Sequence, residues 1–341
     1  DPADLVTNLS SLDPETTLFI INSKSFSTSE TLTNTESAME WVENALGIDS
    51  QILQKHFVAV TANKSKAESY GFAPENIFPI WDWVGGRFSV SSATSLAVMV
   101  AVGPDNFKRM LEGCRQMDEH FQASSLTENI PALMGLISLW NRNFLGYSSS
   151  AVIPYSQDFM FFPAYLEQLE MESNGKNIDR EGNLAKYETG PAILGGVGTN
   201  AQHSFFQLLH QGTKLIPCDF IAFQKPLSKG LEEHNILISN FLAQANALML
   251  GEETTDAHKN IEGNKPSNSL FINSLTPYNL GAIISMYENK IFTIGSILNI
   301  FSFDQWGVEL GKSVANEILD GNTESLDTST KSLLDKFKKE E

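Results

Sequence analysis

Residues 17–46 have the sequence TLFIINSKSFSTSETLTNTESAMEWVENAL, which points directly to a fold class. An apolar run over residues 17–21 is followed by a hydroxyl-rich turn and then by a helical pattern over residues 35–46. A short apolar run, a polar turn and an amphipathic helix are typical of one strand–helix unit of an α/β protein. The same order of strand, turn and helix recurs along the rest of the chain.

Short apolar runs alternate with helical patterns beyond this unit. The expected strands cover residues 57–61, 77–80, 151–153, 192–194, 214–216, 220–223 and 270–272. The expected helices cover residues 91–102, 130–144, 162–171, 201–210, 232–250 and 280–300. This alternation predicts an α/β fold with doubly wound parallel sheets and helices on both faces. Because ligands of such sheets bind at the carboxyl ends of strands, the loops that follow strands are the first candidates for a site.

The length of the chain suits about two domains. Gly103-Pro104-Asp105 separates two strand–helix groups, so we expect a first α/β domain over residues 1–104, a second over 105–300 and a helical segment over 301–341. The first group holds only three expected strands, too few for an independent doubly wound domain. We therefore expect this domain to be incomplete and an upstream segment to accompany it. Residues 251–268 are polar and without periodicity, which predicts a surface loop.

The composition excludes several classes of partner. Lys plus Arg is 23 and Asp plus Glu is 41, which gives a net charge of −18. Such a charge repels nucleic acids and anionic membranes, and no apolar run is long enough to span a bilayer. Two cysteines, Cys114 and Cys218, are too few for a disulfide framework, so we expect buried free thiols in a reducing cytoplasm. Because the overall charge is negative, an anionic substrate would need hydrogen-bond donors and cations placed directly in its binding site.

The turn after the first expected strand combines hydroxyls with a lysine. Ser23, Lys24, Ser25 and Thr28 lie between this strand and the following helix, with Glu30 just beyond. Hydroxyls, backbone N–H groups and a helix N-terminus all favour a bound phosphate. Ser/Thr clusters also occur as plain turns and helix caps, but the position after a strand favours a phosphate site.

Two further segments carry residues suited to acid–base chemistry. Arg87 follows Gly85-Gly86, where the backbone can approach a ligand and a guanidinium can stabilise a developing negative charge. Gln168 and Glu172 are four residues apart at the end of an expected helix and share one face. The alternatives are a surface arginine and an ordinary charged helix face. We expect Glu170 in solvent and a helix end at Asn174-Gly175.

The remaining candidates lie on two later helices. His203 falls in the first turn of the helix expected over residues 201–210, where the helix dipole favours the neutral imidazole. Gln305 and Lys312 are seven residues apart, which places them on one face if residues 303–312 are helical. Taken alone, a structural histidine and a solvated lysine are the ordinary interpretations.

In this order, the segments resemble the phosphoglucose isomerase family over the whole chain. The resemblance lies in SKSFSTSET (23–31), DWVGGRFSVSSA (82–93), QLEMESNGK (168–176), GTNAQHSFFQLLHQGTK (198–214), IPCDF (216–220) and FDQWGVELGK (303–312). It implies two sugar isomerase (SIS) domains and no metal or organic cofactor. It also implies homodimers with shared active sites, and interconversion of glucose 6-phosphate and fructose 6-phosphate through a cis-enediolate.

Residue roles follow from the same resemblance. The phosphate-binding positions are Ser23, Lys24, Ser25 and Thr28, and the other substrate contacts are Gln168 and Gln305. Glu172 matches the base that moves a proton between C1 and C2, and Arg87 matches the group beside the enediolate oxygens. His203, from the neighbouring subunit, and Lys312 match the ring-opening pair, with Glu30 orienting the histidine.

The sequence departs from the family at one internal turn. Residues 194–198 read LGGVG where the family usually shows Trp-Gly-Glu-Pro-Gly, and family chains also begin well upstream of Asp1. Two alternatives stay open: a non-catalytic sugar-phosphate-binding SIS module, and an isomerase of a related hexose phosphate. The joint presence of Arg87, Glu172, His203 and Lys312 favours an enzyme.

Overall fold

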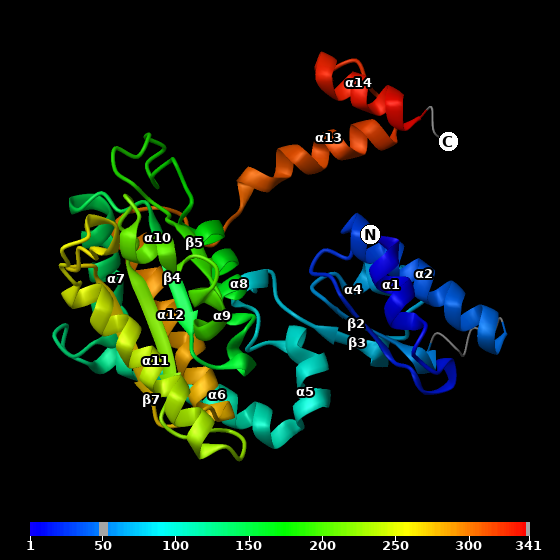
Figure 1. Cartoon of the computed structure of the whole chain (residues 1–341). Coiled ribbons are helices and arrows are strands. Elements are labelled where there is room, and N and C mark those ends of the chain that lie inside the picture. Colours follow the sequence, from blue (N-terminus) through cyan, green and yellow to red (C-terminus); the bar gives the residue numbers. More distant parts are fainter. Residues whose placement is uncertain (48–53, 339–341) are drawn as a thin grey trace.

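The computed structural model describes residues 1–47 and 54–338, and its strands form two parallel sheets (Figure 1). The strands are β1 (Phe19–Asn22), β2 (Phe57–Thr61), β3 (Ile77–Pro79), β4 (Ser149–Pro154), β5 (Ala192–Gly195), β6 (Cys218–Phe223) and β7 (Ser267–Ile272). The longer helices are α1 (Pro2–Leu9), α2 (Ser29–Leu46), α6 (Pro104–Ala123), α7 (Ile130–Leu139), α11 (Leu231–Leu250), α12 (Pro277–Ile297), α13 (Glu309–Leu319) and α14 (Thr328–Phe337). The shorter ones are α4 (Lys64–Ser69), α5 (Leu96–Val102), α8 (Phe162–Leu166), α9 (Gly198–Gln202) and α10 (Phe206–Gln211).

The first sheet has the order β1-β2-β3, with both strand pairs parallel. Successive residues of β2 point to opposite faces. Ala59 packs with residues of α2 and α4, whereas Val60 packs with Ile80, Val84 and Leu96. Helices therefore cover one face, and the chain segment after β3 covers the other. This segment leads from the first sheet to Arg87.

The second sheet has the order β5-β4-β6-β7, and all its strand pairs are parallel. Every residue of β6 is buried, because this strand lies between two others and beneath two helical layers. On β4, Val152 packs with residues of α8 and α12, whereas Ala151 and Ile153 pack with residues of α9, α10 and α11. The predicted α/β fold with two parallel sheets is confirmed, and its helices cover both faces of the second sheet (Figure 1).

Two glycines bring α6 and α12 into backbone contact. A Cβ atom added to Gly113 would lie 1.9 Å from the carbonyl oxygen of Tyr278, and one added to Gly281 would lie 1.9 Å from that of Met110. No side chain fits at either position, so the helices pack closer than ordinary ridge-and-groove contact allows. This crossing fixes α12, which leads into the residues that surround Arg87.

Several expected elements differ from the structure. Residues 214–216 form no strand: β6 begins at Cys218, because Pro217 has no N–H to continue a ladder, and Ile216 is buried by packing alone. Residues 251–266 lie outside the strands, as predicted, but β7 already begins at Ser267. Trp81 and Trp83 stack on each other at the surface, so neither belongs to the core.

The two C-terminal helices extend away from the second sheet (Figure 1). No residue of α13 or α14 is buried. Within residues 1–47 and 54–338, no helix combines the length and the apolar character needed to cross a bilayer. Cys114 and Cys218 are free and buried, as predicted, and burial raises the pKa of each thiol to about 12.

Candidate active site

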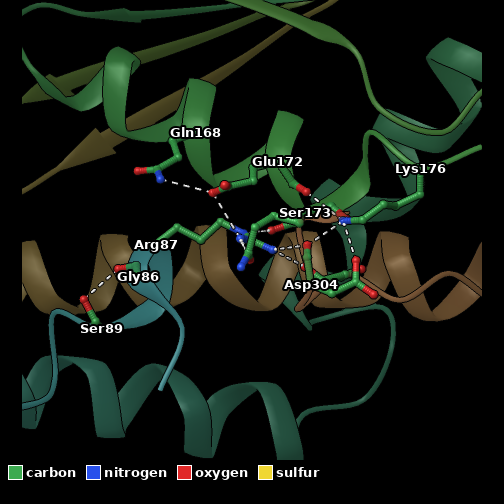
Figure 2. A network of polar contacts seen from close by, with 10 residues as sticks. Gly86, Arg87, Ser89, Gln168, Glu172, Ser173, Lys176 and Asp304 are labelled. Atoms are coloured by element: carbon green, nitrogen blue, oxygen red, sulfur yellow. Dashed lines mark hydrogen bonds and ion pairs between the residues drawn. The ribbon is translucent and has the colours of Figure 1, made fainter. Parts of the chain in front are cut away.

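Arg87 follows the last strand of the first sheet, and its side chain reaches a group of polar residues beside the second sheet. It lies in a single helical turn, Gly86–Phe88, after β3. A Cβ atom on Gly85 or Gly86 would meet no atom of the described chain within 4 Å, so both glycines border open space. The Arg87 side chain extends towards the helix end that carries Glu172 (Figure 2).

The guanidinium of Arg87 is enclosed by five contacts. Its Nε donates to Ser173 Oγ at 2.7 Å, and its Nη2 donates to the carbonyl oxygens of Ser302 and Asp304 at 2.6 and 3.1 Å. Its Nη1 donates to Gln305 Oε1 at 3.2 Å and lies 3.0 Å from Glu172 Oε2. Five contacts match the five N–H donors of an arginine, so the orientation of the positive charge is fixed.

Glu172 and Gln168 lie on a π-helical segment, Glu167–Glu172, that continues α8. Gln168 Nε2 donates to Glu172 Oε2 at 3.1 Å, which confirms that the two side chains share one face (Figure 2). The Glu172 side chain is 25% exposed, whereas that of Arg87 is 3% exposed. The carboxylate is therefore partly exposed to solvent, and the guanidinium that contacts it is buried. π-Helical turns are rare and are frequently found at functional sites.

The helix ends after Asn174, as predicted from Asn174-Gly175. A Cβ atom on Gly175 would lie 2.3 Å from the carbonyl oxygen of Met171, so a larger residue does not fit here. Asn174 is buried, and its Oδ1 accepts a hydrogen bond from Ser302 Oγ at 2.9 Å. This bond links the helix end to the segment that contacts Arg87.

Lys176 is a second cation of the site that residue spacing did not identify. Its Nζ donates to the carbonyl oxygens of Glu172, Ser173 and Asp304 at 2.7, 2.9 and 2.9 Å (Figure 2). It also lies 3.5 Å from Asp304 Oδ1. Burial lowers the pKa of Lys176 despite the nearby Asp304 carboxylate, and the charge of Arg87 acts in the same direction as burial. The only sequence signal was the position of Lys176 within QLEMESNGK.

Gln305 lies in the site, but not on a helix face shared with Lys312. Its backbone has φ −149°, and α13 begins only at Glu309. The helical interpretation of residues 303–312 is therefore wrong for the first part. The physical reason is that Arg87 and Lys176 both bind the carbonyl oxygen of Asp304, which is then not available to a helical hydrogen bond.

The hydroxyl-rich loop forms a polar pocket at the carboxyl end of β1. Lys24, Ser25 and Thr28 line a cavity of about 670 Å³, together with Asn63 and Lys64. Thr28 is the N-cap of the 18-residue helix α2, and its side chain makes no capping hydrogen bond. Lys24 Nζ donates to the carbonyl oxygen of Asp82. The pocket thus combines two lysines, several hydroxyls and a helix N-terminus.

Ser23 links this loop to the neighbourhood of Arg87. Its side chain is buried, and its Oγ has no hydrogen-bond partner in the part of the chain that the structure describes. A smaller cavity of about 160 Å³ is lined by Ser23 and Lys24 on one side and by Gly86 and Ser89 on the other. A buried hydroxyl without a hydrogen-bond partner costs free energy. At this position it is suited to donate a hydrogen bond to a bound ligand.

Three expected site residues lie outside this network. Lys312 is 63% exposed on α13 and pairs with Glu309 at 2.9 Å. Glu30 is exposed in the first turn of α2, where it lines a separate pocket beside α1. His203 is also exposed. Within residues 1–47 and 54–338, no hydrogen bond or ion pair joins these three to Arg87 or Glu172.

The position of His203 is a correction. It caps the C-terminus of α9 instead of lying in the first turn of a longer helix. α9 begins at Gly198, where a Cβ atom would lie 2.6 Å from the ring of Tyr155, and its last turn tightens through a bond from His203 N to the carbonyl of Asn200. The apolar pattern continues through this break into α10, so spacing alone did not reveal it.

Glu170 is a second correction. It was expected in solvent, but its side chain is 4% exposed and lies near Arg142 and Lys290. Charged residues on a surface helix and in a buried ion pair look alike in sequence. Among the described residues, no cluster of three or more His, Cys, Asp or Glu side chains could hold a metal ion.

A scan against protein-family models matches residues 1–334 to the family described as phosphoglucose isomerase. The chain belongs to the phosphoglucose isomerase family. Curated members include the glucose-6-phosphate isomerases of Deinococcus deserti and Nitrosospira multiformis, each 46% identical over 99% of this chain and matched over 66% and 65% of their own lengths. The chain thus spans about two thirds of the length of these relatives.

A solved phosphoglucose isomerase family structure has the same fold. It is the crystal structure of a glucose-6-phosphate isomerase from Chlamydia trachomatis, which matches with a TM-score of 0.90 and 37% identity. The match covers 99% of this chain and 65% of that one. The resemblance seen in the sequence motifs is therefore confirmed at the level of family and fold.

Proposed function

We propose that this chain forms the catalytic part of an isomerase that interconverts glucose 6-phosphate and fructose 6-phosphate, the step shared by glycolysis and gluconeogenesis. The observation that carries the proposal is a partly exposed Glu172 carboxylate that has Arg87 and Gln168 on the same oxygen. Relatives named glucose-6-phosphate isomerase are 46% identical to this chain, which supports this choice of substrate.

In the proposed reaction, Glu172 removes the proton next to the carbonyl of the open sugar and returns it to the neighbouring carbon. The intermediate is a cis-enediolate, whose negative charge needs a cation that is already in place. Arg87 supplies that charge. Because its five N–H groups are all matched by protein contacts, we infer that it stabilises the enediolate through its field and holds Glu172, instead of donating directly to the substrate oxygen.

The phosphate end of the substrate is assigned to the loop after β1. Ser25 and Thr28 offer hydroxyls, Lys24 a positive charge and α2 its N-terminus. We infer that Ser23 donates its unpaired hydroxyl to the same ligand. Binding energy gained at the phosphate then positions the reacting carbons at Glu172.

Ring opening requires a base on the C1 hydroxyl and an acid on the ring oxygen. We assign this step to His203 and Lys312, both of which lie at the surface and away from Arg87 in this chain. We therefore infer a homodimer in which His203 enters the site of the neighbouring subunit, where Glu30 orients it. Two buried free thiols suit the reducing cytoplasm expected for such an enzyme.

The decisive experiment uses the full-length protein and follows the conversion of fructose 6-phosphate to glucose 6-phosphate, coupled to NADP reduction by glucose-6-phosphate dehydrogenase. Binding of a phosphorylated sugar acid is measured by calorimetry on the same sample. We expect both turnover and binding. Binding without turnover would favour a non-catalytic sugar-phosphate module. Conversion of fructose 6-phosphate to mannose 6-phosphate instead of glucose 6-phosphate, measured by chromatography because the coupling enzyme does not detect it, would change the assigned substrate.

A further inference from the structure

The π-helical segment that carries Glu172 also has a polar side that faces the interior. Glu170 lies two residues before Glu172, and residues two apart on a helix point to nearly opposite sides. Gln168 and Glu172 face Arg87, whereas Glu170 is buried under the segment. One short stretch of helix thus presents the proposed base on one side and a buried carboxylate on the other.

Two cations hold the buried carboxylate. Lys290 Nζ of α12 lies 3.5 Å from Glu170 Oε2, and Arg142 Nη2 lies 3.9 Å from Glu170 Oε1. Arg142 also donates to the carbonyl oxygen of Thr189. A charge removed from water is stable only when it is paired, so Glu170 is confined to the place that these cations define.

Lys290 connects Glu170 to β6, an inner strand of the second sheet. Its Nζ lies 3.8 Å from Asp219 Oδ2 on β6, which also accepts a hydrogen bond from Tyr287 Oη at 3.1 Å. Asn268 Nδ2 of β7 donates to the other Asp219 oxygen at 2.7 Å. Burial acts to lower the pKa of Lys290, but the Glu170 and Asp219 carboxylates outweigh it and raise this pKa, so Lys290 remains an ammonium ion.

We propose that Glu170 and Lys290 are positioning residues that hold the Glu172 carboxylate against Arg87. The inference rests on the proposed role of Glu172 as the base. A π-helical turn differs from a regular helix in its hydrogen-bond spacing, so rewinding this segment would rotate Glu172 relative to Arg87. The ion pair between Glu170 and Lys290 opposes that rotation, because turning the segment would separate two buried charges.

The test compares Glu170→Gln with Glu167→Gln. The second variant makes the same change of charge in the same segment, at a position that has no ion pair with any residue the structure describes. Rate constants are divided by the number of folded sites, counted by titration with a phosphorylated sugar acid that binds without reacting. We expect Glu170→Gln to lower kcat by about tenfold or more while KM changes by less than about twofold, because misplacing a catalytic group affects mainly turnover. Glu167→Gln should match the wild type.

A merely structural role predicts a different result. It would lower the temperature of unfolding and the number of folded sites, but leave kcat per site unchanged, and that result would overturn the proposal. If Glu170→Gln does not fold, Glu170→Gln combined with Lys290→Met decides, since this pair of substitutions removes one charge of each sign. The double variant should show the same loss of kcat per site; wild-type kcat in it would also overturn the proposal.

The assay also separates this inference from the proposed function. If the wild type and Glu167→Gln bind the sugar acid but convert no fructose 6-phosphate, the proposed function is wrong, and the positioning role is wrong with it. If both are active and the two Glu170 variants keep wild-type kcat per site, only the positioning role is wrong.

Discussion

Glu172 Oε2 lies 3.0 Å from Arg87 Nη1, and the two partners differ sharply in their access to water. The Glu172 side chain is partly exposed, whereas the Arg87 side chain is almost fully buried. A solvent-accessible carboxylate next to a fixed positive charge is suited to moving a proton and stabilising the anion that results. The pair also joins the segment that follows β3 to the helical segment that continues α8.

Replacing Glu172 with Gln should remove turnover and retain sugar-phosphate binding. Gln keeps the shape of Glu and can still accept from Arg87, but it cannot take a proton at neutral pH. We expect kcat to fall by roughly a hundredfold to ten-thousandfold, with calorimetric binding of a phosphorylated sugar acid nearly unchanged. Turnover close to that of the wild type would contradict the assignment of the base.

Arg87→Lys should lower kcat more than it raises KM. A lysine keeps the charge but cannot reach Ser173, Ser302 and Asp304 together, so both the charge and Glu172 lose their fixed positions. Steady-state kinetics separate the two parameters. A rise in KM at constant kcat would instead make Arg87 a binding residue.

Ser23→Ala should weaken phosphate binding without destabilising the ligand-free protein. The Ser23 hydroxyl is buried and has no hydrogen-bond partner among the described residues, so its removal leaves no group there unsatisfied and can raise stability by about 1 kcal/mol. KM for fructose 6-phosphate should rise. Ser37→Ala, at an exposed position of α2, is the matched control. Lower stability of Ser23→Ala with normal KM would show that the hydroxyl is structural.

Glu288 should make the stability of the protein depend on pH. Burial, followed by the Asp118 carboxylate, raises the pKa of Glu288 from 4.5 to about 7. The folded state then binds a proton that the unfolded state has lost between these two values. The free energy of unfolding should therefore fall as the pH rises from about 4.5 to about 7, by on the order of 3 kcal/mol in total.

Urea unfolding at pH 5 and at pH 8 measures this effect. Glu288→Gln should reduce the difference in unfolding free energy between the two pH values, because its amide does not titrate. Glu253→Gln, at an exposed position, should retain the difference. An equal pH dependence in the wild type and in Glu288→Gln would exclude Glu288 as the source.

The sequence predicted those features that depend on local patterns of residues. Apolar runs marked β2 and β6, and the four-residue spacing of Gln168 and Glu172 placed their side chains together. Spacing could not show that Glu170 is buried, because its partners Arg142 and Lys290 are distant in the chain.

Local hydrogen bonding accounts for the other differences between the sequence predictions and the structure. His203 was assigned to the wrong end of a helix, since the break after α9 depends on tightened backbone bonds that leave the apolar pattern intact. Gln305 was assigned to a helix because no residue pattern showed that the carbonyl of Asp304 binds two cations.

The contacts of Arg87 and Lys176 also affect what sequence comparison can detect. These two cations donate to the main-chain carbonyl oxygens of four residues: Glu172, Ser173, Ser302 and Asp304. Every residue type has a carbonyl group, so a substitution at position 302 or 304 can preserve these bonds without a compensating change at Arg87 or Lys176. Methods that infer contacts from correlated substitutions would therefore find little signal from the bonds of Arg87 to these carbonyl groups, although they join segments more than 200 positions apart in the chain.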